Sequence, residues 1–240
     1  MEGTPKDRQR LLLELSTVND PSTNYNKALN ERHKGTGKWF LGSNAFIELK
    51  KEPKSFLWLC GIQGCGKSVL SSTIVENVIC RCELYNELAV LHFYFDFNDV
   101  EKQRDENLLR SLVSQLCIRS SAVPEVLESL YMSCMNGERQ PSCQMLLATW
   151  LQMVTAFREI FIILDARDES VERPKLLADI EEIFERENTN LHVLITSRRE
   201  KDIEESLARL SQERGTICIQ SALMPTFAAT YMISFRPIES

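Results

Sequence analysis

Short apolar runs alternate along this chain with segments whose apolar residues recur at helical spacing. Since strands that alternate with helices build parallel sheets through right-handed crossovers, the pattern predicts an α/β fold. We expect a three-layer core in which a five-stranded parallel sheet is flanked by helices. The predicted strands cover residues 55–60, 88–95, 160–165, 191–196 and 216–220, and helices after residue 68 and at 107–120, 123–133, 145–157, 174–186 and 202–210 separate them.

Residues 61–68 carry the complete pattern Gly-x-x-x-x-Gly-Lys-Ser of a phosphate-binding loop, or P-loop. It lies between a predicted strand and a predicted helix, which is the context that such a loop requires. Its glycines let backbone N–H groups surround an anion, and the helix dipole adds positive potential. We predict that Lys67 reaches the β- and γ-phosphates of a nucleotide and that Ser68 is a ligand of Mg²⁺. The predicted nucleotide-binding residues are Gly61, Ile62, Gln63, Gly64, Cys65, Gly66, Lys67, Ser68 and Val69.

A second candidate feature is Asp165, which follows five consecutive apolar residues at the end of a predicted strand. This is a Walker B pattern, in which a carboxylate holds Mg²⁺ and a second carboxylate nearby orients the attacking water. We predict that Asp165 is the magnesium residue, together with Ser68, and that Glu169 orients water. An acidic residue at a strand end is common in turns, so Asp165 alone would be weak support.

The third feature is a basic residue at the end of the strand predicted at 191–196. Arg198 follows that strand through Thr196 and Ser197, and an arginine at this point can sense a γ-phosphate. We prefer Arg198 to Arg199 because it lies nearer the strand. The alternative is an exposed arginine that closes a loop. The predicted catalytic set is thus Lys67, Asp165, Glu169 and Arg198.

Composition narrows the function classes. With 240 residues, of which 43% are apolar, the chain can bury the core of one sizeable domain. Its net charge of −6, without any Lys/Arg-rich run, argues against broad attraction to nucleic acids or anionic membranes. No apolar run approaches the roughly 20 residues that span a bilayer, and the N-terminus has no signal-peptide pattern. We therefore expect a soluble protein of the cytoplasm.

The eight cysteines form no paired C-x-x-C pattern, and the three histidines are scattered. We expect reduced, mostly buried thiols and no zinc site. Cys65, inside the P-loop and near a helix N-terminus, is the candidate for a reactive thiol. The alternative is that its position in the loop simply tolerates variation.

The P-loop, the segment Leu164-Asp165-Ala166-Arg167-Asp168-Glu169 and the segment Ile195-Thr196-Ser197-Arg198, in this order, resemble the NACHT class of signal-transduction ATPases. The chain looks most like fungal members with a nephrocystin-like N-terminal module. Further similar residues lie at 35–41, 93–99 and 108–116. The resemblance implies that the arginine-bearing strand lies between those of the P-loop and Asp165. It also implies a conformational switch driven by ATP/ADP exchange, as in STAND and NLR-like proteins, with oligomerisation in the active state.

The resemblance covers about residues 25–223 and defines the predicted domains. Residues 1–24 would be a helical extension, 25–223 the NACHT-like nucleotide-binding domain and 224–240 an irregular tail. Three features depart from the family. Arg167 stands where the family has an apolar residue, and no carboxylate immediately follows Asp165. The chain also ends before the helical and winged-helix domains that normally follow. We therefore expect slow Mg²⁺-dependent hydrolysis and a truncated or isoform product.

Two other functions remain open at this stage. The P-loop would also serve a nucleotide or small-molecule kinase, although neither an arginine-rich lid nor an acceptor site is evident. A truncated chain could instead be a non-catalytic decoy that binds full-length relatives. A GTPase is less consistent with the sequence, because guanine specificity usually uses the motif Asn-Lys-x-Asp. The Asn-Lys pair in this chain, Asn26-Lys27, precedes the P-loop and is followed by Ala28-Leu29. The expected partners are a nucleotide, further copies of the chain or full-length NACHT relatives.

Overall fold

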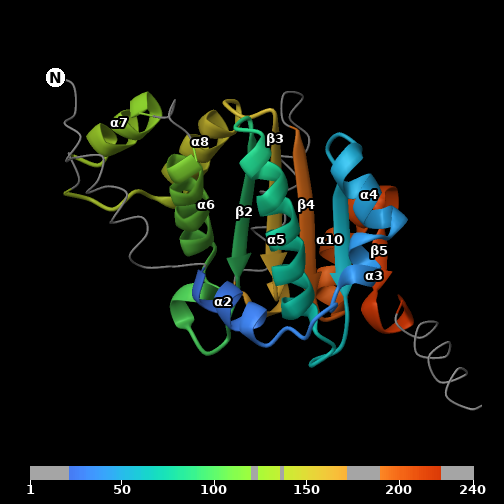
Figure 1. The fold of residues 1–240 in the computed structure, drawn as a ribbon. Helices are drawn as coiled ribbons and strands as arrows, with labels where there is room; N and C mark the ends of the chain where they lie inside the picture. Colours follow the sequence, from blue (N-terminus) through green and yellow to red (C-terminus); the bar gives the residue numbers. More distant parts are fainter. Residues whose placement is uncertain (1–21, 120–123, 136–137, 172–189, 223–240) are drawn as a thin grey trace, which may run out of the picture.

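The computed structural model describes residues 22–119, 124–135, 138–171 and 190–222. In these residues five strands form one sheet in the order β2-β3-β4-β1-β5, and every neighbouring pair is parallel (Figure 1). This confirms the predicted α/β fold with a parallel sheet between helical layers. The strands are β1 (Phe56–Cys60), β2 (Leu88–Tyr94), β3 (Glu159–Asp165), β4 (Leu191–Ser197) and β5 (Thr216–Cys218).

Helices cover both faces of the sheet. One face carries α3 (Lys38–Leu41), α4 (Asn44–Lys51) and α5 (Lys67–Leu84), and α5 crosses the front of the sheet in Figure 1. The other face carries α6 (Asp105–Arg119), α7 (Pro124–Ser133), α8 (Cys143–Val154) and α10 (Lys201–Arg214). The remaining elements are α2 (Ser22–Asn30), which packs on α5, and the 3₁₀ turns η1 (Val100–Gln103) and η2 (Arg167–Glu169).

The central strands are mostly apolar because both of their faces are covered. In β1, Leu57 and Leu59 belong to the core under α4 and α5, whereas Phe56 and Trp58 belong to the core under α6 and α8. Successive side chains of a strand point to opposite faces, so a continuous apolar run serves two cores at once. The uninterrupted apolar runs of the sequence are thereby explained.

The strand order has a direct consequence for function. β4 lies between β1 and β3, as the resemblance implied. The carboxyl ends of these three strands, which carry the P-loop, Arg198 and Asp165, therefore meet at one edge of the sheet, where ligands of open α/β sheets bind. The three sequence features are neighbours in space although up to about 135 residues separate them in the chain.

Some elements differ from the expectations. The last strand is shorter than 216–220, because the chain turns into a helical segment after Cys218, and the Ile219 side chain then joins the core beneath α5. The helices α3 and α4 were not expected; α4 begins where Ser43 Oγ accepts a hydrogen bond from the Phe46 N–H at 3.3 Å. The helix predicted at 174–186, most of the extension at 1–24 and the tail at 224–240 lie outside the described residues. α2 runs across the division expected after residue 24, so the domain limits stay predictions.

Candidate nucleotide-binding site

The P-loop links the end of β1 to the first turn of α5. Gly64 and Gly66 have φ angles of 75° and 87°, in the left-handed region that favours glycine. Gly61 is required for a different reason, since a Cβ atom there would lie 2.5 Å from the Cys65 sulfur. Its N–H also donates to the Ser197 carbonyl at 3.1 Å, which ties the start of the loop to the end of β4. The loop therefore needs glycine at these positions, for the positive φ angles of Gly64 and Gly66 and for the lack of space at Gly61.

The Lys67 side chain folds back across the loop. Its Nζ donates to the carbonyl oxygens of Gly61 and Ile62, both at 2.9 Å. These bonds hold the ammonium over the concave side of the loop, beside the backbone that would surround phosphate groups. The charge predicted to meet the β- and γ-phosphates is therefore placed at the anion-binding end of α5.

Asp165 joins three elements through hydroxyl groups. Its Oδ2 accepts a hydrogen bond from Ser68 Oγ, and its Oδ1 accepts from Ser71 Oγ and Thr196 Oγ1, each at 2.6 Å. Thr196 Oγ1 in turn accepts from the Ala166 N–H at 3.0 Å. One carboxylate at the end of β3 is therefore bonded to α5 and to β4, and it directly contacts the hydroxyl predicted to bind Mg²⁺.

The surroundings of Asp165 suit a cation. The side chain is buried, and burial raises the pKa of its carboxyl group, while the three hydroxyl hydrogen bonds and the Lys67 charge act in the opposite direction. Carboxylate and hydroxyl oxygens are the ligands that Mg²⁺ prefers. Ser68 and Asp165 therefore fit a magnesium ion beside the P-loop, with a buried negative charge for the ion to neutralise.

The turn after β3 carries two further carboxylates. Ala166, with φ of 55°, redirects the chain into η2, which contains Asp168 and Glu169. Glu169 Oε2 accepts a hydrogen bond from the Phe97 N–H at 3.0 Å. Burial raises the pKa of the Glu169 carboxyl group, and the nearby Asp168, Asp96 and Asp165 charges raise it further. Glu169 is thus an acidic group with an increased affinity for protons, as a group that accepts a proton from water requires.

Arg198 is held by Asp168. Its Nε donates to Asp168 Oδ2 at 2.5 Å, and its backbone N–H donates to Asp168 Oδ1 at 2.9 Å. The hydrogen bond to Asp168 raises the pKa of the Arg198 guanidinium group. Arg199 points elsewhere: its side chain is 62% exposed and pairs with Glu204 at 2.5 Å. Of the two arginines, only Arg198 is placed at the site.

Arg167 is accommodated away from the site. It is fully buried, and its guanidinium group lies over the Phe95 ring at 5.3 Å from the ring centre. This cation–π contact is one favourable interaction of the buried guanidinium group. The departure from the family at this position therefore does not put an additional positive charge into the phosphate region.

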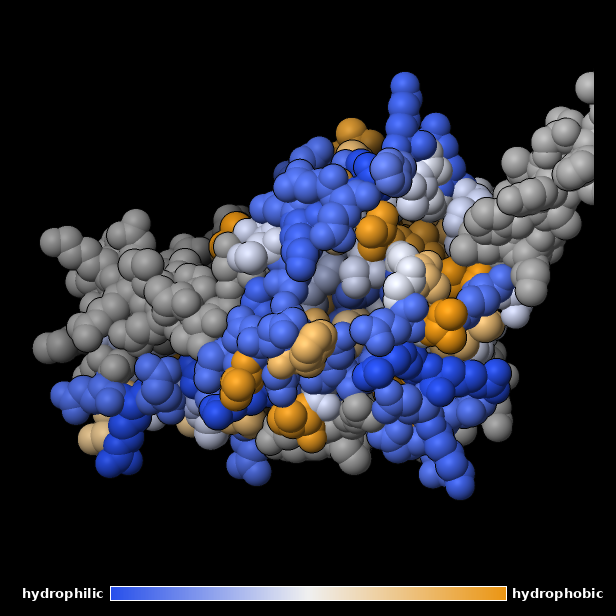
Figure 2. Space-filling view, turned by 90° about the horizontal axis from the view of Figure 1, so that it is seen from below, coloured by the Kyte–Doolittle hydropathy of each residue, from blue (hydrophilic) through white to orange (hydrophobic). Residues whose placement is uncertain are grey.

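A cavity of about 770 Å³ opens at the carboxyl edge of the sheet, a size typical of small-molecule sites. Figure 2 looks onto this edge, a largely hydrophilic face with hydrophobic side chains interspersed. The predicted residues that line the cavity are Gln63, Gly64, Gly66, Lys67, Ser68, Val69, Glu169 and Arg198. Gly61, Ile62 and Cys65 belong to the loop but not to the lining, and Asp165 lies buried beneath Ser68.

Six lining residues were not predicted. They are Glu31, Phe97, Ala166, Asp168, Ser170 and Val171. Asp168 had a sequence signal, because it stands beside Glu169 in the acidic segment after β3. Phe97 and Val171 had none, although they are 64% and 65% exposed and place apolar surface at the rim of the cavity.

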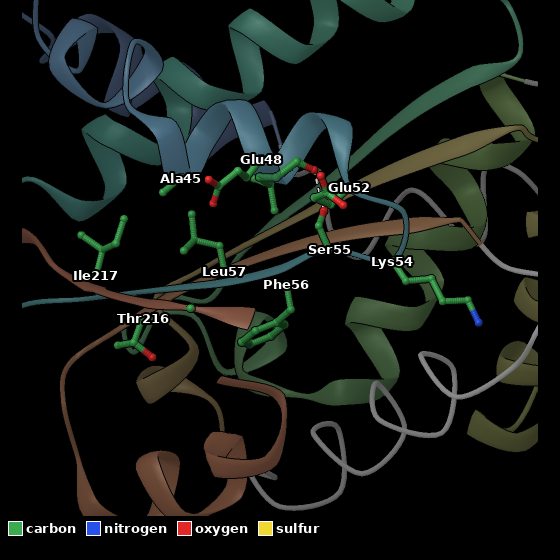
Figure 3. Close-up of a pocket in the computed structure, with 11 residues that line it drawn as sticks. Ala45, Glu48, Glu52, Lys54, Ser55, Phe56, Leu57, Thr216 and Ile217 are labelled. Carbon is green, nitrogen blue, oxygen red and sulfur yellow. Dashed lines mark hydrogen bonds between the residues drawn. The ribbon is translucent and has the colours of Figure 1, made fainter. Parts of the chain in front are cut away.

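A second cavity, of about 400 Å³, lies at the opposite end of β1 (Figure 3). Its wall includes Ser55, whose Oγ lies 2.7 Å from His192 Nδ1, and His192 Nε2 lies 3.9 Å from Glu159. A serine, a histidine and a glutamate are the residues of a nucleophilic triad, but the Ser55 hydroxyl proton does not point to His192. Ser55 Oγ donates to the Leu49 carbonyl at 2.5 Å, so His192 Nδ1 must donate to Ser55. This cluster ties α4 to the sheet rather than activating a nucleophile.

Among the described residues, the helices lack the combination of length and apolar character that a membrane span requires. The same residues contain no group of three or more histidine, cysteine or acidic side chains arranged to hold a metal ion. A Mg²⁺ ion bound by Ser68, Asp165 and nucleotide phosphates would not require such a group.

Similarity to solved structures is distant. The Aeropyrum pernix ORC1 protein in complex with DNA has 15% sequence identity and a TM-score of 0.48, over 72% of this chain and 42% of that chain. C. elegans PCH-2 has 12% identity and a TM-score of 0.34, over 85% of this chain and 46% of that chain. The chain thus spans less than half the length of each. These similarities lend no support to an activity.

Sequence comparison identifies a family, which the distant structural similarities do not. No curated protein matches the chain significantly. A protein family does match, over residues 35–198, and this region includes the P-loop, Asp165, Glu169 and Arg198. Because the match covers more than half of the chain, it assigns the family. The core of this chain is a three-layer α/β fold with a P-loop sequence after β1. The chain belongs to the family described as "Nephrocystin 3, N-terminal".

Proposed function

We propose that this chain is an adenine-nucleotide switch that binds ATP and ADP with Mg²⁺ in the cavity at the carboxyl edge of the sheet. The observation that carries the proposal is the 2.6 Å hydrogen bond from Ser68 Oγ to Asp165 Oδ2. It brings the P-loop hydroxyl and the Walker B carboxylate, 97 residues apart, to the one place where both can bind the same cation.

Each loop residue has a distinct part in binding. Backbone N–H groups of the loop beyond Gly61 surround the phosphates, with the positive end of α5 behind them. Lys67 releases the Gly61 and Ile62 carbonyls and turns to the β- and γ-phosphates, where it gains a charge-assisted hydrogen bond. Ser68 and Asp165 would hold Mg²⁺, which would neutralise phosphate charge when bound. Phe97 and Val171 give the apolar part of the nucleotide a surface at the rim.

Glu169 is the residue that we assign to hydrolysis. It lines the same cavity as Lys67, and its raised pKa favours acceptance of a proton from the attacking water. However, its carboxylate is hydrogen-bonded to the Phe97 N–H, so it must exchange this bond to orient a water molecule. Hydrolysis is accordingly slow, which suits a switch in which the bound nucleotide defines the state.

The pair Arg198 and Asp168 is the switching contact. Both residues line the cavity, and Asp168 holds the guanidinium group in the conformation described here. A γ-phosphate competes with Asp168 for Arg198, whereas ADP lacks that group. ATP would therefore release the end of β4 from η2, and ADP would restore the contact. A ligand shifts such an equilibrium by the difference in its affinity for the two states.

In the cell, this switch would belong to a NACHT-type, NLR-like signalling protein of the fungal kind that the sequence resembles. Residues 25–223 would form its nucleotide-binding domain, and the ATP state would assemble with further copies of the chain or with full-length relatives in the cytoplasm. Light scattering after gel filtration tests this assembly. Glu169→Gln with Mg-ATP should give a larger mass than with Mg-ADP; equal masses across micromolar concentrations would exclude nucleotide-controlled assembly of this chain.

Nucleotide preference is tested by competition. A fluorescent ATP analogue bound to the wild-type chain with Mg²⁺ should be displaced by ATP and ADP at similar concentrations. GTP should require at least about tenfold more, a difference of about 1.4 kcal/mol in binding free energy. Displacement by GTP at the same concentration as ATP would contradict the adenine assignment while leaving phosphate binding intact.

A further inference from the structure

Two cysteines face each other at the base of the P-loop. Cys60 ends β1 and Cys218 ends β5, and they are directly paired as the last register position of the parallel β1 and β5 ladder. Their side chains share a hydrogen bond. Directly paired residues of neighbouring strands lie about 4.8 Å apart, inside the range of roughly 4.4 to 6.8 Å that a disulfide allows between Cα atoms. The register thus places two thiols where they can be joined without moving the strands apart.

The two thiols have unequal environments. Cys60 is 1% exposed, and burial, together with the neighbouring Cys218 sulfur, raises the pKa of its thiol. Cys218 is half-buried, and hydrogen bonds from the backbone and side chain of Ser221 lower the pKa of its thiol. The thiolate is the form that reacts with oxidants. Cys218 is therefore the group that reagents meet first, and Cys60 is a protected thiol in contact with it.

The pair is also continuous with the phosphate-binding loop. Cys60 is followed directly by Gly61, and a Cβ atom at Gly61 would lie 3.3 Å from Gln220 Oε1 and 3.6 Å from Ile219 Cβ. The segment after Cys218 thus packs against the first residue of the P-loop. β5 reaches this point from the second cavity, where Thr216 and Ile217 appear in Figure 3. A covalent bond at Cys218 would fix the entry to the loop against this segment.

We propose that Cys60 and Cys218 are a redox-active dithiol that peroxides convert into a reversible disulfide at the base of the P-loop. The Cys218 thiolate attacks one peroxide oxygen, the O–O bond breaks, hydroxide leaves and Cys218 becomes a sulfenic acid. The Cys60 sulfur then attacks the Cys218 sulfur, the S–S bond forms and the S–O bond breaks. The thiol protons are taken up by the departing hydroxides. Two thiols lose two electrons, and hydrogen peroxide becomes two water molecules.

Cys65 is the one thiol that could compete from within the loop. Its sulfur lies near Gly61, but Cys65 is not paired with Cys60 in the ladder, where the partner of Cys60 is Cys218. Cys80, which is exposed on α5, serves as a control for nonspecific oxidation of an accessible thiol. Only a disulfide between Cys60 and Cys218 is expected, and a disulfide that includes Cys65 or Cys80 would contradict the proposal. It does not depend on nucleotide binding.

The test is peptide mapping of the wild-type chain after treatment with a small excess of hydrogen peroxide. The free thiols should fall by two from eight, and a non-reduced digest should contain one peptide linked through Cys60 and Cys218. Dithiothreitol should restore both thiols. Cys218→Ser should lose the linkage, and Cys80→Ser should retain it. A link from Cys65 to either residue, a sulfinic acid at Cys218 without a link, or eight unchanged thiols would overturn the proposal. Since the wild-type map decides, a variant that fails to fold leaves the result interpretable.

Discussion

Arg198 and Asp168 form a two-point contact at the edge of the cavity, because the side chain and the backbone N–H of the arginine donate to the two oxygens of the same carboxylate. The Asp168 side chain is 3% exposed, whereas the Arg198 side chain is 45% exposed. The carboxylate is therefore enclosed by the protein, whereas the guanidinium group is accessible from the solvent. A phosphate in the cavity would have to draw the arginine away from this carboxylate.

Arg198→Ala should narrow the difference between the affinities for ATP and ADP. The variant loses the only contact that we assign to the γ-phosphate from β4, so ATP affinity should fall by about tenfold or more and ADP affinity by much less. Titration calorimetry with both nucleotides measures this. Arg199→Ala is the matched control, since Arg199 pairs with Glu204 outside the cavity lining. Equal losses for ATP and ADP would make Arg198 a structural residue.

Ser68→Ala and Ser71→Ala should separate magnesium binding from packing. Both hydroxyls donate to Asp165 at 2.6 Å, but Ser68 lines the cavity and Ser71 is fully buried. Ser68→Ala should remove most of the Mg²⁺ dependence of nucleotide affinity. Ser71→Ala should keep that dependence and lower the free energy of unfolding by about 1 to 3 kcal/mol, because one hydrogen bond of a buried carboxylate is lost.

Asp165→Asn should have the same effect as Ser68→Ala on the magnesium dependence while leaving some nucleotide bound. The amide keeps the shape of the side chain and removes its charge. Affinities for ATP measured with Mg²⁺ and with a chelator should therefore converge. If the variant binds ATP as the wild type does in both conditions, then Asp165 is not a magnesium ligand.

Glu169→Gln should preserve nucleotide binding and reduce turnover. The amide still accepts a hydrogen bond from the Phe97 N–H through its oxygen, but it cannot take a proton from water. Loss of such a group typically costs about 10²-fold or more. Phosphate release under saturating Mg-ATP is the measurement. Turnover equal to that of the wild type would reject Glu169 as the water-orienting residue.

Stability should decrease in mild acid through His192. Burial lowers the pKa of this imidazole, with a weaker opposing effect of Glu159, so the folded chain holds it neutral while the unfolded chain takes up a proton near about pH 6.5. The contribution of neutral His192 to the free energy of unfolding is complete above that pH. It is lost as the pH falls toward the lower pKa of the folded chain, by up to about 1.4 kcal/mol per pH unit.

Denaturant unfolding between about pH 7.5 and 5.5 measures this effect of His192. His192→Asn, which retains a donor for the Ser55 hydroxyl, should flatten the slope in that interval. A slope unchanged by the substitution would assign the acid sensitivity to other groups.

The sequence was sufficient for those parts of the site that depend on local pattern. The P-loop was predictable because its glycine, lysine and serine positions form a local pattern, and Gly64 and Gly66 do adopt the positive φ angles that favour glycine. Asp165 was predictable because a buried parallel strand is a continuous apolar run, so a carboxylate at its end is conspicuous. The placement of β4 between β1 and β3 followed from the resemblance and is confirmed.

Other parts depend on tertiary contacts that no local pattern reports. The bonds of Asp165 to Ser71 and Thr196, and the pairing of Arg198 with Asp168, arise only when α5, β3 and β4 have packed together. Short helices such as α3 and α4 lack a long amphipathic period. β5 ends at Cys218 because the chain there turns into a helical segment, so the strand was predicted two residues too long.

The most direct test of the account is thermal unfolding of the purified chain without ligand and with Mg-ATP, Mg-ADP or Mg-GTP, beside Lys67→Ala. Ligand at about a hundred times its dissociation constant should stabilise the fold by roughly 2.7 kcal/mol, a shift on the order of 5 to 10 °C. The account predicts this shift with ATP and ADP and its loss in Lys67→Ala, which itself should unfold near the wild-type temperature. Cooperative unfolding of the wild type with no shift by any nucleotide would contradict it.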